Sequence, residues 1–332
     1  QWNLTLEYQL FKNTSITAGY VGHWATHLVA PTDINQPLPG TGAASTWTAA
    51  QTRRPLYGIY PNVTQTSVTD SWAISRYNAL QVSARQRLTR GLEFLVSYTF
   101  SKSLTDNLGY YGSGGVSAQS AYSGNTYNRH GYNYGPAFFD VRHNLVVSNT
   151  YDLPFGKGRW MGKDWHPAVN AVLGGWNVGN IFQLRGGFPM TINLGTARSL
   201  QAPRGSERPN TIAPVVTDSS NPDCYIPNPV NRFCPSGSTS SFSLPDLGTF
   251  GSTGVGTVYA PGFFNWDTTI GKKFYISETK YFDFRAEFFN FTNHPSFSPP
   301  DRTWTATSTT FGQITGVVSP PRNLEFALKF HF

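Results

Sequence analysis

Long segments in which apolar and polar residues alternate strictly constrain this chain more than any other feature. In NLEFALKFHF (323–332) the large apolar residues occupy every even position. Because side chains of a β-strand alternate between its two faces, this segment predicts a strand with one apolar face. Similar segments recur while helical periodicity is nearly absent, so we predict an all-β protein. Its nine strands are expected at about 2–10, 15–27, 75–88, 92–103, 140–153, 175–185, 263–274, 280–290 and 322–332.

The two faces of these strands differ sharply in charge. On the more apolar faces we find a single charged residue, Lys272, near a strand end where its long side chain can reach polar surroundings. The contrast predicts that one face meets an apolar environment and the other a polar one. The opposite faces carry charges of both signs, namely Glu7, Arg85, Arg87, Glu93, Arg142, Asp152, Arg185, Asp267, Lys273, Asp283, Arg285, Glu287, Glu325 and Lys329.

The connections between the strands alternate in length. FKNT, TRG and YISET are short, whereas the loops at about 28–74, 104–139, 186–262 and 291–321 are long. Short turns at one end and long loops at the other are typical of outer-membrane barrels, which have tight periplasmic turns and long extracellular loops. One connection on the short side, 154–176, is longer, and its PAVNAVLGGW predicts one or two helical turns.

Strand length and composition favour a membrane barrel over a large soluble β-sandwich. Strands of roughly 10 residues or more can cross a bilayer at a tilt, and only 13% of the residues are charged while 15% are aromatic. A β-propeller would need a fixed repeat, which the strand spacing lacks. No segment reaches the roughly 18 apolar residues of a spanning helix. Aromatic residues lie near both strand ends, as in the girdles of such barrels: Trp24, Tyr98, Phe100, Phe264 and Trp266 at one, and Trp176, Phe274, Phe330 and Phe332 at the other.

Several blocks of the sequence are similar to a known family. They are QWNLTLEYQL, YNALQVSARQRLTRGLEFLVSYTFSKSLTD, FDVRHNLVVSNTYDLPFGKGR, AVLGGWNVGNIFQLRGGFPMTI, APGFFNWDTTIGKKF and FDFRAEFFNFTNHPSF. On these blocks the chain resembles the C-terminal part of the barrel of TonB-dependent outer-membrane receptors, especially the Oar-like receptors of acidobacteria. The resemblance implies a 22-stranded antiparallel transmembrane β-barrel, filled by an N-terminal plug, that imports large ligands with energy from the TonB complex.

The resemblance also implies that residues 1–332 form about nine of those strands. The plug, the TonB-contacting segment and about 13 strands would then precede them. The partners implied are outer-membrane lipid, the receptor's own plug and remaining strands, the TonB complex and the barrel-assembly machinery. The alternation of short and long connections makes both the first and the last strand run towards the periplasm. We therefore expect the C-terminus to be the natural end, with Phe332 and Phe330 serving as the signal for barrel assembly.

The sequence predicts no enzyme, no cofactor and no metal site. The seven histidines are scattered, and no HExxH, GxSxG or phosphate-binding loop is present. A net charge of +7 is spread along the chain without the basic–aromatic motifs of nucleic-acid binding. Cys224 and Cys234 lie in one Pro/Asn/Ser-rich stretch, which predicts a local disulfide and an oxidising compartment.

A loop rich in Gly, Ser and Tyr is the best candidate for ligand binding. Tyrosine offers a rigid ring and a polar hydroxyl, a combination suited to gripping a sugar or a peptide. A surface barrel that only displays adhesive loops remains the alternative, and an outer-membrane hydrolase would need a catalytic cluster at one rim. The candidate residues are Tyr110, Tyr111, Tyr122, Tyr127, Tyr132 and Tyr134.

Overall fold

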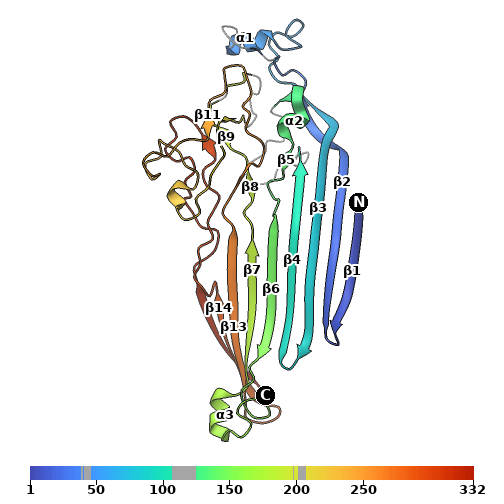
Figure 1. The fold of residues 1–332 in the computed structure, drawn as a ribbon, viewed down its shortest axis with the longest axis vertical. Helices are drawn as coiled ribbons and strands as arrows, with labels where there is room; N and C mark the ends of the chain where they lie inside the picture. The colour runs from blue at the N-terminus through green and yellow to red at the C-terminus, as the bar shows by residue number, and fades with distance from the viewer. Residues whose placement is uncertain (39, 41–45, 107–124, 197, 201–206) are drawn as a thin grey trace.

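The computed structural model contains one antiparallel sheet of nine long strands (Figure 1). It describes residues 1–38, 40, 46–106, 125–196, 198–200 and 207–332. The long strands are β1 (Trp2–Phe11), β2 (Thr14–Asp33), β3 (Ser67–Thr89), β4 (Leu92–Thr105), β6 (His143–Asp152), β7 (Trp176–Arg185), β13 (Phe263–Tyr275), β14 (Tyr281–Phe289) and β16 (Asn323–His331); the short β5 (Gly135–Pro136) extends the partner edge of β4.

Each long strand pairs with the next long strand along the chain, in the order β1-β2-β3-β4-β6-β7-β13-β14-β16. Such an up-and-down order needs only hairpin connections, which an antiparallel pair can make in two residues. The β3–β4 turn does so, with Arg90 and Gly91 both at positive φ (52° and 85°), as a type I′ turn requires. Within the described residues β1 and β16 each have one neighbour, so the sheet has two edges.

All nine predicted strands are found, and most begin and end within about three residues of their expected positions. The exceptions are β2, expected to end at residue 27, and β3, expected to start at residue 75. The pairing of β2 with β3 shifts between Ala25 and Leu28, where His27 has φ 57°, and then continues to Asp33. This bulge breaks the alternation, which is why the pattern stopped there. The loop expected at 28–74 is therefore shorter, at 34–66.

The described parts of the long loops are themselves folded. Residues 186–262 and 290–322, which we call the cap, contain three two-stranded sheets beyond the long-strand ends, and one of these sheets joins the two segments (Figure 1). A smaller group, α1 (Trp47–Thr52), η2 (Thr126–Asn128) and α2 (Arg129–Asn133), belongs to the other two long loops. The cap sheets pair β8 (Pro189–Met190) with β12 (Val258–Tyr259), β9 (Asn193–Leu194) with β15 (Thr303–Trp304), and β10 (Asn210–Thr211) with β11 (Phe242–Ser243).

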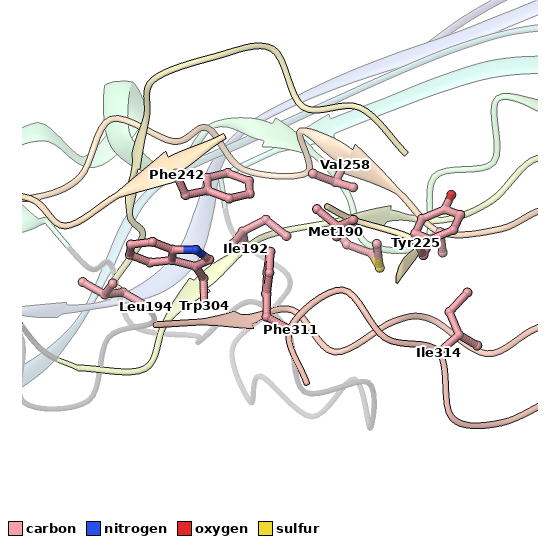
Figure 2. Packing of buried hydrophobic residues seen from close by; sticks show 11 residues of the cluster. Met190, Ile192, Leu194, Tyr225, Phe242, Val258, Trp304, Phe311 and Ile314 are labelled. Carbon is pink, nitrogen blue, oxygen red and sulfur yellow. The ribbon is translucent and has the colours of Figure 1, made fainter. Parts of the chain in front are cut away.

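The main hydrophobic core of the described residues lies in the cap and not between the long strands (Figure 2). Phe311 and Ile192 are fully buried there, and Phe242 meets Phe311 edge to face at 5.7 Å between ring centroids. A loop with its own apolar core holds a defined shape, unlike a solvated connection. The cluster consists of Met190, Ile192, Leu194, Tyr225, Ile226, Phe242, Val258, Ala260, Trp304, Phe311 and Ile314.

The short-turn end carries one helix, α3 (Pro167–Leu173), in the connection where a helical turn is predicted. Pro167 stands at its first position and His166 caps it, accepting a hydrogen bond from the Ala168 amide. None of the helices in the described ranges is long and apolar enough to cross a membrane.

A disulfide joins Cys224 and Cys234 within the cap, with their Cα atoms 5.0 Å apart. Cys224 ends the short helix η3 (Pro222–Cys224) and is buried beside Tyr225 of the core. Closing a loop of about ten residues stabilises the folded state by roughly 2–3 kcal/mol in the chain-entropy view.

We expect replacement of both cysteines (Cys224→Ser with Cys234→Ser) to loosen the cap and leave the sheet intact. Proteolysis within 208–250 should become faster in the full-length protein, whereas its resistance to unfolding by heat in detergent should stay unchanged. The measurement is peptide mapping after limited proteolysis, with the unreduced wild type as control. Unaltered cleavage in the variant would contradict a stabilising role for the disulfide.

Candidate functional site

Most charged side chains of the sheet lie on one face, and five of them surround a hollow of about 860 Å³. Side chains from six strands line it, so the sheet curves around its charged face. The expected separation of charged and apolar faces is therefore present in the structure. The lining includes Arg85, Glu93, Asp267, Arg285 and Glu287, the polar Ser148, Thr150, Asn177 and Thr269, and the apolar Leu95, Ile181 and Phe289.

Charges of opposite sign face each other across neighbouring strands at one end of this face. Asp283 of β14 lies opposite Lys273 of β13 and opposite Lys329 of β16. Along β14, the Arg285 Nη1 atom is 3.5 Å from Glu287 Oε1. Opposite charges on adjacent strands each stabilise a sheet modestly. The arrangement is a wall that carries charges of both signs.

The opposite face is apolar and largely uncovered by protein. Leu4 and Leu6 of β1 are 64% and 66% exposed, and Phe326 of β16 is 67% exposed. Near the short turns, Phe282 pairs with Phe274 and with Phe330 in a row across three strands. Exposed apolar surface of this extent is unstable in water but suited to lipid.

The aromatic residues expected near the long loops are also in place. Phe182 meets Phe264 at 5.1 Å and Trp266 at 6.4 Å between ring centroids. Further round the sheet, Trp24 is 61% exposed and Phe100 is 42% exposed. Aromatic side chains thus mark both ends of the apolar face, as at the two interfaces of a membrane.

Lys272, the charge expected on the apolar face, ends among backbone carbonyls. Its side chain is buried, and its Nζ donates hydrogen bonds to the carbonyl oxygens of Val172 (3.0 Å) and Gly174 (2.5 Å). The ammonium also lies over the rings of Trp176 and Phe274, at 5.1 and 4.9 Å. The polar surroundings that Lys272 reaches are therefore the carbonyls at the end of α3, in agreement with its expected place near a strand end.

Comparison with known proteins agrees with this arrangement of faces. A family model described as "Outer membrane beta barrel domain" matches residues 1–325. The chain belongs to this family. It is an outer-membrane barrel domain, so its apolar face meets lipid and its charged face lines the barrel interior.

Among the solved structures that match the barrel domain is one of low sequence identity. It is the outer membrane transporter YddB from Escherichia coli, with a TM-score of 0.42 and 12% sequence identity. The match covers 98% of this chain and 31% of that protein, so the barrel domain spans less than a third of the transporter's length. No curated protein matches the barrel domain significantly.

The three candidate tyrosines within the described residues do not gather at one place. Tyr110, Tyr111 and Tyr122 lie outside the described residues, and Tyr127, Tyr132 and Tyr134 occupy different surroundings. Tyr127 is half exposed, and its hydroxyl donates to the Gln36 carbonyl at 2.6 Å. Tyr134 follows α2, where its amide donates to the His130 carbonyl.

Tyr127 lines a hollow of about 600 Å³ at the long-loop end of β3. Arg129 forms a 3.2 Å salt bridge with Asp70 there, and its guanidinium lies 5.4 Å from the centre of the Trp72 ring. His130 meets the edge of Trp72 at 5.6 Å between ring centroids. We call this hollow the rim site. Its lining is Asp70, Trp72, Thr126, Tyr127, Asn128, Arg129 and His130.

The sequence did not single out Asp70 or Trp72 as site residues. They lie more than 50 residues before Tyr127, in a polar stretch that was predicted as loop. The signal that would have found them is the continuation of β3 back to Ser67, because that strand carries Trp72 up to the level of α2. His130 is held there by the Asp106 carboxylate, which its Nδ1 contacts.

Tyr132 is buried and fastens α2 to the cap. The Arg208 guanidinium stacks on its ring, 3.6 Å from the ring centre, and donates to the Tyr132 carbonyl through Nη2. Arg208 Nε also donates to the Thr253 carbonyl at 2.6 Å. Burial raises the pKa of the Tyr132 hydroxyl and lowers the pKa of Arg208. In the structure Tyr132 packs α2 against the cap, and it does not line the rim site.

Two further expectations concern chemistry and assembly. Within the described ranges, no group of three or more His, Cys, Asp or Glu side chains is placed to hold a metal ion. Phe330 and Phe332 stack at 6.1 Å between ring centroids, and Phe332 is 92% exposed. Their part in assembly stays a prediction.

The two faces can be tested with a matched pair of substitutions in the middle of β3. Val82 lies on the apolar face and Ser83 on the charged face. Val82→Arg should cost about 2–4 kcal/mol, because arginine then meets the middle of the bilayer, whereas Ser83→Arg should cost little. The measurement is the fraction of heat-modifiable, folded full-length protein in the outer membrane. Equal losses for both variants would contradict the assignment of faces.

We expect Arg208→Ala to loosen the junction between α2 and the cap. It leaves the Tyr132 and Thr253 carbonyls without their donor, which costs about 1–3 kcal/mol for a buried group. Faster proteolysis within 125–139 and 207–262 is the expected result. Arg232→Ala is the control, because Arg232 is exposed and stacks only on Phe233. If the two variants were cleaved at the same rate, the fastening role would be refuted.

Proposed function

We propose that this barrel domain belongs to a TonB-dependent receptor of the Oar-like type. In that receptor it forms part of the wall, the interior surface and the ligand-capturing loops. The full-length protein then takes up a large ligand, an oligosaccharide or a peptide, across the outer membrane with energy from the TonB complex.

The observation that carries the proposal is the folded cap beside a charged wall. Loops that served only to close hairpins would need no apolar core of their own, yet this cap buries eleven residues around Phe311 and Ile192. A preformed surface binds a ligand at a lower entropic cost than flexible loops do. A cap of this kind suits capture of a large ligand better than passive passage of small solutes.

The rim site offers chemistry suited to such ligands. Trp72 and Tyr127 supply flat apolar surface, and Asp70, Arg129 and His130 supply hydrogen-bonding groups around it. Pockets that bind organic ligands usually combine aromatic walls with a few placed polar groups. Both sugars and peptides carry matching apolar faces and polar edges, so either class fits.

The proposed mechanism involves binding and movement without covalent chemistry. The cap and the rim site capture the ligand, the plug moves when pulled from the periplasm, and the ligand passes along the charged wall. Polar and charged groups of both signs, such as Arg85 and Glu93, can replace the water around a polar ligand as it passes.

The test compares cells that produce the full-length protein with and without a functional TonB complex. Fluorescent oligosaccharide and peptide pools are offered, and surface-bound and internalised label are measured separately. We expect binding in both strains and internalisation only where TonB is functional. Binding without any TonB-dependent internalisation would overturn transport and favour an adhesive barrel that displays its loops.

A matched pair of variants links that binding to the rim site. Tyr127→Ala removes a ring that lines the hollow, and Tyr60→Ala removes an exposed ring elsewhere in the long loops. We expect Tyr127→Ala to weaken surface binding several-fold and Tyr60→Ala to leave it unchanged. Equal binding by both variants would remove the rim site from the proposal.

A further inference from the structure

The helix α3 (Pro167–Leu173) lies in the connection between β6 and β7. It exposes its apolar side chains, which is the reverse of what a helix in water does. Its apolar residues Val169, Val172 and Leu173 are 41%, 64% and 52% exposed. A surface helix of a water-soluble protein buries its apolar residues and exposes its polar ones. Here the apolar side chains face outward.

The residue that faces inward is the polar Asn170. Its side-chain Oδ1 accepts a hydrogen bond from the Lys157 amide at 2.7 Å, so it holds the helix against the preceding turn. The backbone amide of Asn170 donates to the His166 carbonyl, and its carbonyl accepts a hydrogen bond from the Gly174 amide. The helix is therefore fastened by hydrogen bonds and not by burial of its apolar side chains.

The C-terminal end of α3 lies on the lipid-facing side of the sheet. Lys272 and Trp176 both belong to that face, and both donate to the Val172 carbonyl, through Nζ at 3.0 Å and Nε1 at 2.9 Å. Figure 1 shows α3 at the short-turn end of the long strands, near the C-terminus. The exposed side of the helix therefore continues the apolar face that meets lipid.

The turn before the helix adds the side chains that favour a membrane surface. Trp160 is 80% exposed, and Lys157 and Lys163 are exposed on the same connection. Tryptophan concentrates at membrane interfaces, and lysines near the surface are attracted to anionic lipid headgroups. Apolar helix residues, an exposed indole and basic residues together match an interfacial segment.

We propose that residues 154–175 anchor the barrel in the phospholipid leaflet next to the short turns. Val169 and Val172 insert among the acyl chains, while Lys157 and Lys163 contact headgroup phosphates. The Val172 carbonyl meanwhile satisfies Lys272, the charge that would otherwise stand unpaired on the lipid face. The partner is lipid, because the helix surface continues the lipid-facing surface of the barrel.

The test places an environment-sensitive fluorophore at Val172→Cys in the full-length protein, reconstituted into phospholipid vesicles. Val216→Cys in the cap is the matched control, since Val216 is 63% exposed and Val172 is 64% exposed. Within residues 1–332 the two cysteines are joined to each other and do not take up the label. Vesicles with and without acyl-chain quenchers then report contact with lipid.

We expect label at residue 172 to show blue-shifted emission and to lose most of it with quencher-bearing lipid. Label at residue 216 should show neither effect. Emission at 172 that matches 216 would overturn the proposal, and so would a blue shift that the lipid quencher leaves unchanged, because a protein would then cover the helix. If Val172→Cys fails to assemble, Val169→Cys provides the same reading on the same helix.

Discussion

The structure depends on one constraint, the pairing of backbone hydrogen-bonding groups where no water is available. In the hydrocarbon region an unpaired amide or carbonyl costs several kcal/mol, so strands can span only when each has partners on both sides. Pairing between neighbouring strands supplies these partners from β2 through β14, with a bulge between Ala25 and Leu28 of β2 near the long-loop end. The alternation of side chains then assigns every second residue to lipid.

A second consequence concerns polar groups on the lipid side. Lys272 is tolerated on that face because the backbone carbonyls of Val172 and Gly174 accept its protons. Those carbonyls are available because a helix ends there, and the last carbonyls of a helix lack partners within it. The helix end and the lysine therefore satisfy each other. The connection between β6 and β7 is longer than the other connections at the short-turn end, and its helix supplies the carbonyls that Lys272 needs.

The sheet could be predicted from the sequence because its side-chain period is set by the two environments. The prediction stopped early at His27, where a bulge breaks the period although the pairing continues to Asp33. The cap could not be predicted, because its pairs join distant segments that carry no periodic signal of their partner. Trp304 beside Leu194 is one such pair, in a parallel bridge between loops more than 100 residues apart. The rim site could not be predicted either. Trp72 lines the same hollow as Tyr127 only because β3 begins as early as Ser67.

The cap is a continuation of the wall and not a flexible attachment to it. β8 follows β7 after three residues and pairs with β12, which in turn leads into β13, so the β7–β13 hairpin continues into the cap. The segments around Gly187 and Ala260 come so close that a Cβ at position 187 would meet the Ala260 carbonyl oxygen. Met190, Ile192 and Leu194 then keep the alternation of a strand but turn it towards the core of the cap. The cap is therefore joined without a long linker to β7 and β13, which carry Asn177 and Asp267 on the interior face.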